Sequence, residues 1–323
     1  MKPPAFWSDP DSVLGALLSP LGAVYAGAGR ARRRRAKPWR APVPVICVGN
    51  LTLGGAGKTP TAIHILRRLA ERGLAAHALS RGYGGSERGP HLVRPEIDDP
   101  ARVGDEPLIL ASHAPTWISR DRAAGARAAV AAGAQALVLD DGFQNPALEK
   151  DLSLIVIDGP AGFGSGRVVP AGPLREPVAE GLARAEAVLI LGRGDPLAGI
   201  PFEKPVLRGR VEPAFAGIPF KGLRALAFAG IGRPEKFFAM LRGLGVELAA
   251  TRAFPDHAPY DDAILRRLAR EAEALDAQLI CTEKDAVKFP AWFRGAALPV
   301  PAKLTLQDEK ALDALLDGTL RKF

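Results

Sequence analysis

Residues 52–59 read Thr-Leu-Gly-Gly-Ala-Gly-Lys-Thr and follow an apolar run from Val43 to Val48. The run has the composition of a buried strand, and the residues after Lys58 have the apolar spacing of a helix. Glycines between a strand and a helix let successive backbone N–H groups converge on phosphate oxygens. A lysine at the start of the helix can reach the outer phosphates, and a threonine hydroxyl can bind Mg²⁺. The stretch therefore predicts a binding site for a nucleoside triphosphate.

The match to the phosphate-binding pattern G-x-x-x-x-G-K-[ST] is incomplete, because Thr52 occupies the position of the first glycine. An ordinary turn between a strand and a helix is the alternative. The Gly-Lys-Thr ending and the Pro60 that follows it, tolerated in a first helical turn, favour phosphate binding. The predicted nucleotide-binding residues of this turn are Thr52, Gly54, Gly55, Gly57, Lys58 and Thr59.

Composition describes a globular protein with a local excess of positive charge. The chain has 323 residues, of which 47% are hydrophobic, so it can bury a large core and is long enough for two domains. Its net charge is +8, but the segment Arg30–Arg40 holds seven basic residues and no acidic one. That segment accounts for nearly all of the excess charge. The two cysteines, Cys47 and Cys281, lie in predicted buried strands, which argues against a structural disulfide and fits a reducing compartment.

The first 40 residues combine an apolar segment with that basic run. Apolar side chains recur at helical spacing from Val13 to Tyr25, with Ser19-Pro20 able to end one short helix and start another. The apolar stretch, Val13 to Ala28, contains a proline and is shorter than the roughly 20 residues that span a bilayer. With arginines directly after it, the segment predicts an amphipathic helix at an anionic membrane surface.

Three other interpretations of this segment are open. A secretory signal places its charges before the apolar run, whereas here they follow it. An arm that binds nucleic acid would have aromatic residues among its charges, and these are sparse. A helix packed on the core, followed by a solvated basic loop, remains the main alternative.

A second apolar strand, Ala136–Leu139, ends in Asp140 and Asp141 after an alanine-rich helix over 121–132. A carboxylate at the end of a strand beside the Lys-Thr turn can hold Mg²⁺ directly or through water, although such acids also serve as helix caps. Further strands are predicted over 75–79, 154–157 and 188–191, alternating with helices. This alternation predicts an α/β fold with a doubly wound, mostly parallel sheet.

Asp105 lies in a polar turn, Val103–Pro107, between the two halves of the predicted nucleotide site. Phosphoryl transfer to a hydroxyl benefits from a base that orients the hydroxyl and accepts its proton. Spacing alone favours a turn or helix cap at this position.

Ordered motifs along nearly the whole chain extend the pattern. They are Val48-Gly49-Asn50-Leu51-Thr52, Ser80-Arg81-Gly82-Tyr83-Gly84, Gly104-Asp105-Glu106-Pro107, Asp140-Asp141-Gly142-Phe143-Gln144, Gly172-Pro173-Leu174-Arg175-Glu176, Ala229-Gly230-Ile231-Gly232-Arg233-Pro234, Phe254-Pro255-Asp256-His257 and Thr282-Glu283-Lys284-Asp285. Together with the Gly-rich turn, they resemble the tetraacyldisaccharide 4'-kinase family, whose members phosphorylate the lipid A precursor disaccharide at the inner membrane of Gram-negative bacteria. Thr52 resembles the family's own variant of the first glycine.

The resemblance implies an ATP-dependent, Mg²⁺-requiring lipid kinase on the cytoplasmic face of the inner membrane, bound peripherally. Its acceptor would be an acylated disaccharide lipid that enters between a P-loop core over 41–203 and a smaller α/β domain over 204–323, after the membrane-contacting segment 1–40. It implies no nucleic acid partner, and no protein partner follows from it.

The resemblance also assigns roles to single residues. Asp105 and His257 would act as a pair that activates the sugar hydroxyl. Asp140, Asp141 and Gln144 would serve Mg²⁺ and the phosphates, and Arg175 and Glu176 would lie near the transferred group. Ala258 and Asn145 stand where the family pattern leads us to expect histidines, which affects peripheral contacts rather than the reaction.

Two other functions are compatible with parts of the sequence. A membrane-associated P-loop ATPase, acting as a switch or partitioning motor, would need only the nucleotide site and the amphipathic segment. It leaves Asp105 and His257 without a role. A non-enzymatic module that binds anionic lipid or nucleic acid through the basic run leaves the Gly-rich turn without a role.

Overall fold

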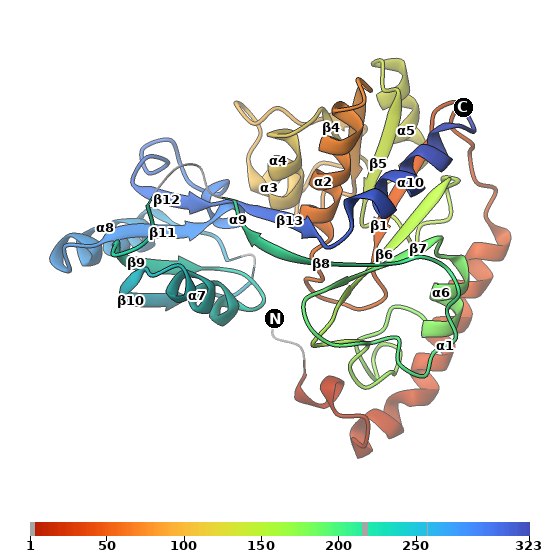
Figure 1. The fold of residues 1–323 in the computed structure, drawn as a ribbon, viewed down its shortest axis with the longest axis horizontal. Helices are drawn as coiled ribbons and strands as arrows, with labels where there is room; N and C mark the ends of the chain where they lie inside the picture. Colours follow the sequence, from red (N-terminus) through yellow and green to blue (C-terminus); the bar gives the residue numbers. More distant parts are fainter. Residues whose placement is uncertain (1–3, 215–218, 257) are drawn as a thin grey trace.

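A computed structural model describes residues 4–214, 219–256 and 258–323. The larger of its two sheets has nine strands in the order β13-β8-β7-β6-β1-β5-β2-β4-β3 (Figure 1). All pairings are parallel except those of the two edge strands, β3 with β4 and β13 with β8. The prediction of a mostly parallel, doubly wound sheet is confirmed. Its strands are β1 (Val45–Gly49), β2 (Ala76–Ser80), β3 (His91–Leu92), β4 (Thr116–Ile118), β5 (Ala136–Asp140), β6 (Leu152–Asp158), β7 (Ala187–Leu191), β8 (Val206–Pro213) and β13 (Ala302–Leu306).

Helices cover both faces of this sheet, because its central strands are apolar on both sides. Ile46 and Val48 of β1 face one side, where α2 (Lys58–Ala70) and α10 (Glu309–Leu320) complete a core cluster. Val45 and Cys47 face the other side, with α5 (Arg122–Ala131) and α6 (Val178–Arg184). The sheet is therefore buried between two layers of helices.

A second, smaller sheet has four parallel strands in the order β10-β9-β11-β12. Helix α7 packs on one of its faces and α8 on the other. Residues 204–323 therefore supply strands to both sheets, since β8, β13 and α10 belong to the larger one. The elements of the smaller unit are β9 (Arg224–Ala229), α7 (Pro234–Gly243), β10 (Glu247–Ala253), α8 (Asp262–Ala274), β11 (Gln278–Thr282), α9 (Glu283–Ala286) and β12 (Ala297–Val300).

Two short helices lie between β3 and β4 and face the smaller unit: α3 (Pro100–Val103) and α4 (Asp105–Ala111). Val103 and Leu108 pack in one small apolar cluster with Val287, which follows α9. The two sheets are therefore joined by packing as well as by the chain (Figure 1).

The first element of the described residues is a short 3-10 helix (Ala5–Ser8). It is followed by α1 (Val13–Arg35), which is one continuous helix through Pro20. The expectation that Ser19-Pro20 divides it into two helices is wrong. The reason is tertiary packing on both sides of the proline: Gly15 and Gly22 lie against the loop at residues 167–171. A Cβ at Gly22 would come within 2.7 Å of the Val168 carbonyl oxygen, so the helix and the loop are in close contact there.

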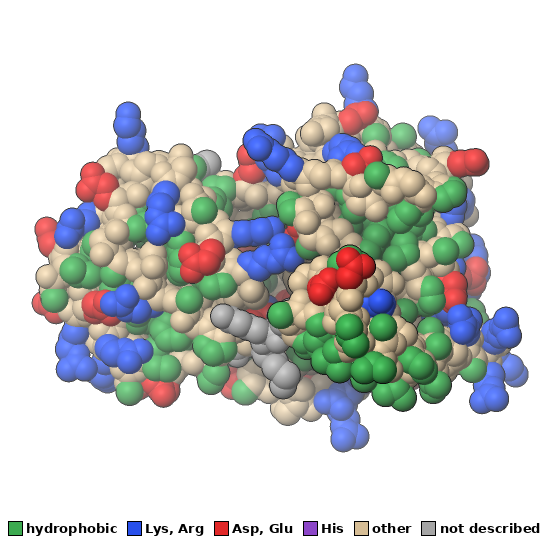
Figure 2. Space-filling view, turned by 90° about the horizontal axis from the view of Figure 1, so that it is seen from below, with side chains coloured by type: hydrophobic (Ala, Val, Ile, Leu, Met, Phe, Trp, Pro, Cys, Tyr) green, Lys and Arg blue, Asp and Glu red, His purple; other side chains and the backbone are tan. Residues whose placement is uncertain are grey.

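The small residues of α1 face the protein, and its large apolar residues face outward. Val13, Leu17 and Val24 are 75%, 72% and 71% exposed. Figure 2 shows hydrophobic side chains gathered in the lower right part of the face seen from below, with a group of Lys and Arg side chains beside them at the right edge. Among the residues that the structure describes, none of the helices is both long enough and apolar enough to span a bilayer.

Candidate nucleotide and phosphoryl-transfer site

The Gly-rich turn joins the end of β1 to the start of α2, as the sequence predicts. Gly57 is the N-cap of α2 at φ +87°, in the left-handed region that favours glycine. A Cβ there would also collide with Leu191 of β7. Gly54 has φ +115°, and a Cβ on it or on Gly55 would meet no neighbouring atom. The turn thus combines a required backbone conformation with open space beside two glycines, which is where a phosphate chain would approach.

Lys58 and Thr59 lie beside the two aspartates at the end of β5. Thr59 Oγ1 donates to Asp140 Oδ2 at 3.0 Å, and Lys58 Nζ is 3.8 Å from Asp141 Oδ2. The contact arises because β1 and β5 are parallel neighbours, with Val48 opposite Asp140. The turns that follow the two strands therefore lie at the same edge of the sheet. The Gly-rich turn and the two aspartates are in contact there, as the sequence predicts.

The two aspartates have opposite electrostatic environments. Burial of Asp140, followed by the nearby charge of Glu106, raises the pKa of its carboxyl to about 7. Its Oδ1 is buried without a hydrogen-bond partner. Burial also acts on Asp141, but Lys58 and Arg175 outweigh it and lower the pKa of that carboxyl. Asp141 has φ +57°, an unusual conformation for a residue other than glycine.

The residues around Asp140 fit a magnesium ion shared with a nucleotide. Within the described residues, no group of three or more His, Cys, Asp or Glu side chains is arranged to hold a metal. Mg²⁺ at kinase sites uses one or two carboxylates together with phosphate oxygens and water, so such a group is not required. The buried, unpartnered Oδ1 of Asp140 and the hydroxyl of Thr59 are oxygen ligands of the kind that this ion prefers.

Arg175 and Gln144 form a hydrogen-bonded chain that starts at Asp141. Arg175 binds both carboxylate oxygens of Asp141, at 2.7 and 3.0 Å, and lies 3.3 Å from Gln144 Oε1. The amide nitrogen of Gln144 donates to the Asn50 carbonyl at 2.9 Å and to Glu176 Oε1 at 3.1 Å. Arg175 and Gln144 therefore fix the orientation of Asp141 and tie it to the end of β1.

Glu176 is only 2% exposed and is held by arginines from two helices. Arg33 of α1 lies 3.3 Å from its Oε2, and Arg184 of α6 donates to the same oxygen. Arg30 and Arg33 also pair with Glu180, and Arg40 pairs with Glu149. Arg30, Arg33 and Arg40 therefore have acidic partners distant in sequence, and contact of the basic run with a membrane surface stays a prediction.

Asp105 is the first residue of α4 and is 8% exposed. Gly104 before it has φ +89°, and a Cβ there would collide with the carbonyl oxygen of Tyr83. Lys288, which follows α9 in the smaller unit, places its Nζ 3.4 Å from Asp105 Oδ2. Sequence reasoning missed Lys288, because no motif joins these distant residues. His257, the expected partner of Asp105, lies outside the described residues.

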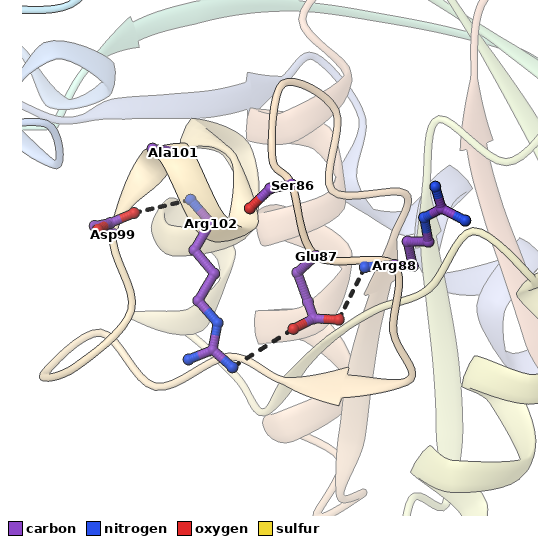
Figure 3. Close-up of a pocket in the computed structure, with 6 residues that line it drawn as sticks. All are labelled: Ser86, Glu87, Arg88, Asp99, Ala101 and Arg102. Carbon is purple, nitrogen blue, oxygen red and sulfur yellow. Dashed lines mark hydrogen bonds and ion pairs between the residues drawn. The ribbon is translucent and has the colours of Figure 1, made fainter.

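A hollow shares no lining residue with this site; it is lined by residues 86–88 and by Asp99, Ala101 and Arg102 (Figure 3). Its charged groups bind one another: Glu87 accepts from Arg102 and from the N–H of Arg88, and the Arg102 N–H donates to Asp99. These contacts stabilise the loop and do not point to a ligand.

Comparison with known proteins agrees with this geometry. The sequence profile of the family described as tetraacyldisaccharide-1-P 4'-kinase matches residues 14–321. The chain belongs to this family. A tetraacyldisaccharide 4'-kinase of Dinoroseobacter shibae is 55% identical, with 98% of this chain and 97% of that protein covered. One from Rhodospirillum centenum is 56% identical, with 98% and 96% covered.

A solved structure places the fold in the same family. A crystal structure of LpxK from Aquifex aeolicus, described as the "apo" form in complex with ATP, aligns with a TM-score of 0.76 at 26% identity. The alignment covers 95% of this chain and all of that one. The chain is therefore a kinase of the tetraacyldisaccharide 4'-kinase family, and the resemblance seen in its motifs is confirmed.

Proposed function

We propose that this kinase transfers the γ-phosphoryl group of ATP to the 4'-hydroxyl of a tetraacylated glucosamine disaccharide 1-phosphate, a step of lipid A biosynthesis. The observation that carries the proposal is the cluster in which Lys58 and Thr59 of the Gly-rich turn meet the carboxylates of Asp141 and Asp140. It supplies a cation, a hydroxyl and two acids at one edge of the sheet, next to a turn whose backbone can bind phosphate. The family of the chain supplies the identity of the acceptor.

The nucleotide would bind along the turn at Thr52, Gly54, Gly55 and Gly57. Lys58 would contact the outer phosphates, and its Nζ lies 3.8 Å from Asp141 Oδ2. Thr59, Asp140 and Asp141 would hold Mg²⁺. When bound, this ion would neutralise charge on the phosphate oxygens. Arg175 would orient Asp141, Gln144 would hold Arg175, and Glu176 would hold Gln144.

The acceptor would enter between the two sheets, where α4 faces α9. Asp105, with His257, would orient the 4'-hydroxyl and accept its proton as the oxygen attacks phosphorus. The placement of Asp105 at the N-terminus of a helix favours the ionised carboxylate that this role needs. The burial of Asp105 keeps bulk water away from its carboxylate.

Helix α1 would bind the membrane surface and so bring the enzyme to its lipid acceptor. Its outward apolar side chains would lie among the lipid headgroups and the upper acyl chains, and Arg32, Arg34, Arg35 and Lys37 would contact anionic headgroups. Such a protein would be peripheral, on the cytoplasmic face where ATP is available. We further propose a functional division into the membrane helix, the nucleotide core and the smaller unit around β9 to β12.

A labelling experiment tests the reaction. Purified protein with γ-labelled ATP, Mg²⁺ and the tetraacyldisaccharide 1-phosphate in vesicles should transfer label to the lipid, and the Lys58→Ala variant should not. A P-loop ATPase would instead release the label as inorganic phosphate whether or not the lipid is present. Release to water alone would contradict the proposed function.

A further inference from the structure

Lys288 carries a buried positive charge between carboxylates of the two structural units. Its side chain is 5% exposed, and its Nζ lies 3.4 Å from Asp105 Oδ2 in α4 and 3.4 Å from Asp285 Oδ1 in α9. The carbonyl oxygen of Ala258 is also 3.4 Å away. An ammonium group has three N–H donors, and these three acceptors match that number. The position of the charge is therefore fixed from several directions.

Asp285 anchors this lysine to the smaller unit. Its carboxylate is fully buried and accepts from the Gly230 N–H, the Tyr260 hydroxyl at 2.9 Å and the Thr282 hydroxyl at 2.6 Å. Because these donors remain when Lys288 is replaced, Asp285 would not be left without partners. The smaller unit thus fixes Asp285 without the help of Lys288. Lys288 lies between Asp285 and Asp105 and connects the smaller unit to Asp105.

A buried carboxylate needs a compensating charge to stay ionised and a fixed partner to keep one orientation. Asp105 can accept a hydroxyl proton only as the anion, and small errors in its position would cost rate. Lys288 meets both needs from outside the nucleotide core. It does not lie among the residues that would bind the phosphates.

We propose that Lys288 is a positioning residue for phosphoryl transfer, which holds the carboxylate of Asp105 in place and in its ionised form from the smaller unit. This inference rests on the proposed role of Asp105. It makes that role depend on contact between α4 and the segment that follows α9.

Other charged groups near this contact keep their own partners. Lys284 pairs with Asp256 at 3.2 Å, and His113, in the turn after α4, lies 3.9 Å from Glu283. Replacing Lys288 would leave these pairs in place. The titratable side chains on the elements that meet here, besides Asp105, Asp285 and Lys288, are Glu106, His113, Asp256, Tyr260, Glu283 and Lys284. His257 lies outside the described residues.

The test compares Lys288→Met, Lys288→Arg, Asp105→Ala and the Asp105→Ala/Lys288→Met double variant in the lipid kinase assay. Lys310→Met, on an exposed position of α10, is the matched control. In Lys288→Met we expect kcat to fall about 10-fold or more, with KM for ATP within about 2-fold of wild type. Lys288→Arg should recover much of the loss, because it retains the charge.

Two readouts separate positioning from a purely structural role. Removing the positive charge should raise the pKa of Asp105, so the acidic limb of the kcat profile should move to higher pH and the loss should be larger at pH 6 than at pH 8. In the double variant, Lys288→Met should add less than about 2-fold to the loss from Asp105→Ala, because both changes remove one function.

Several outcomes would overturn the inference. These are a kcat of Lys288→Met within about 2-fold of wild type at all pH values, or multiplicative losses in the double variant. If Lys288→Met does not fold, Lys288→Gln decides by the same measurements, and failure of both to fold would assign Lys288 to stability alone. Full kcat in Asp105→Ala would instead remove the proposed role of Asp105. Loss in Asp105→Ala with none in Lys288→Met would remove only the role of Lys288.

Discussion

Thr59 and Asp140, from the two predicted halves of the nucleotide site, are joined by a hydrogen bond of 3.0 Å from Thr59 Oγ1 to Asp140 Oδ2. The bond leaves Asp140 Oδ1 buried and without a partner. A group of this kind is costly in the free protein and is stabilised when a cation binds. The arrangement therefore provides part of the coordination that a metal-bound nucleotide would complete.

Replacing Lys58 or Thr59 tests this nucleotide site. Lys58→Ala removes a positive charge from the outer phosphates, and Thr59→Ala removes a hydroxyl ligand and the hydrogen bond to Asp140. Each should lower kcat/KM for ATP by about 10²-fold or more. Steady-state kinetics at varied ATP, with Lys310→Met as control, measures the effect. Near-normal turnover at saturating ATP in either variant would contradict the assignment of the phosphate-binding turn.

Asp140→Asn should make the protein more stable at neutral and higher pH and should lower its kinase activity. The pKa of Asp140 is about 7 in the folded protein and near 3.8 when unperturbed, so ionisation costs the folded state stability as pH rises through this window. Asparagine stays neutral and can still accept the bond from Thr59. The ligand-free variant should therefore gain little at pH 4 and melt roughly 5 °C higher than wild type at pH 8, while losing most kinase activity.

Thermal melts at both pH values without nucleotide measure this change in stability. Asp141→Asn is the comparison, because the pKa of Asp141 is lowered and its ionised form is paired with Arg175. Its contribution to stability is present above the unperturbed pKa and is lost as pH falls, so this variant should be less stable than wild type at pH 8. A stabilising effect of equal size in both variants would contradict the electrostatic difference described here.

The apolar face of α1 and its free arginines should contribute to membrane binding in different ways. Leu17→Ser with Val24→Ser should weaken binding to anionic vesicles at any salt concentration, since both side chains are more than 70% exposed. Replacing Arg32, Arg34 and Arg35 by Gln should weaken binding mainly at low salt. Vesicle co-sedimentation at several salt concentrations distinguishes the two.

Two variants provide the controls for α1. Arg33→Gln should affect stability more than binding, because Arg33 pairs with Glu176 and Glu180. Deletion of residues 1–40 should move the protein to the soluble fraction, although it also uncovers the loop at 167–171. Unchanged vesicle affinity in the Leu17/Val24 variant and in the deletion would assign α1 to a structural role.

Local patterns allowed the nucleotide core to be predicted from the sequence. The strand before Asn50 and the strand that ends at Asp140 are continuous apolar runs, and parallel pairing then brings their ends together. The turn at Gly57 is readable because its backbone conformation requires glycine. Periodicity and turn chemistry act over a few residues, so they need no knowledge of distant contacts.

Contacts between distant segments could not be predicted in this way. The pairing of Arg33 with Glu176 and of Lys288 with Asp105 depends on how α1 and α9 pack on the core. In the sequence, Arg33 is one of several arginines in a basic run, and no local pattern indicates that it pairs with the buried Glu176. The continuity of α1 through Pro20 has the same origin, since the loop at 167–171 supports the helix on both sides of the proline.

Asp105 and His257 separate a lipid kinase from an ATPase switch, and they give the most decisive test. If Asp105 orients the acceptor hydroxyl and takes its proton with support from His257, Asp105→Ala and His257→Ala should each lower kcat about 10²-fold or more. Nucleotide affinity, measured separately by titration, should stay near wild type because Lys58, Thr59 and Asp141 are unchanged. The double variant should be little worse than the more damaged single variant, since residues that act as one unit are not additive. Full activity in both single variants would remove this mechanism, and multiplicative losses would show that the two residues act independently.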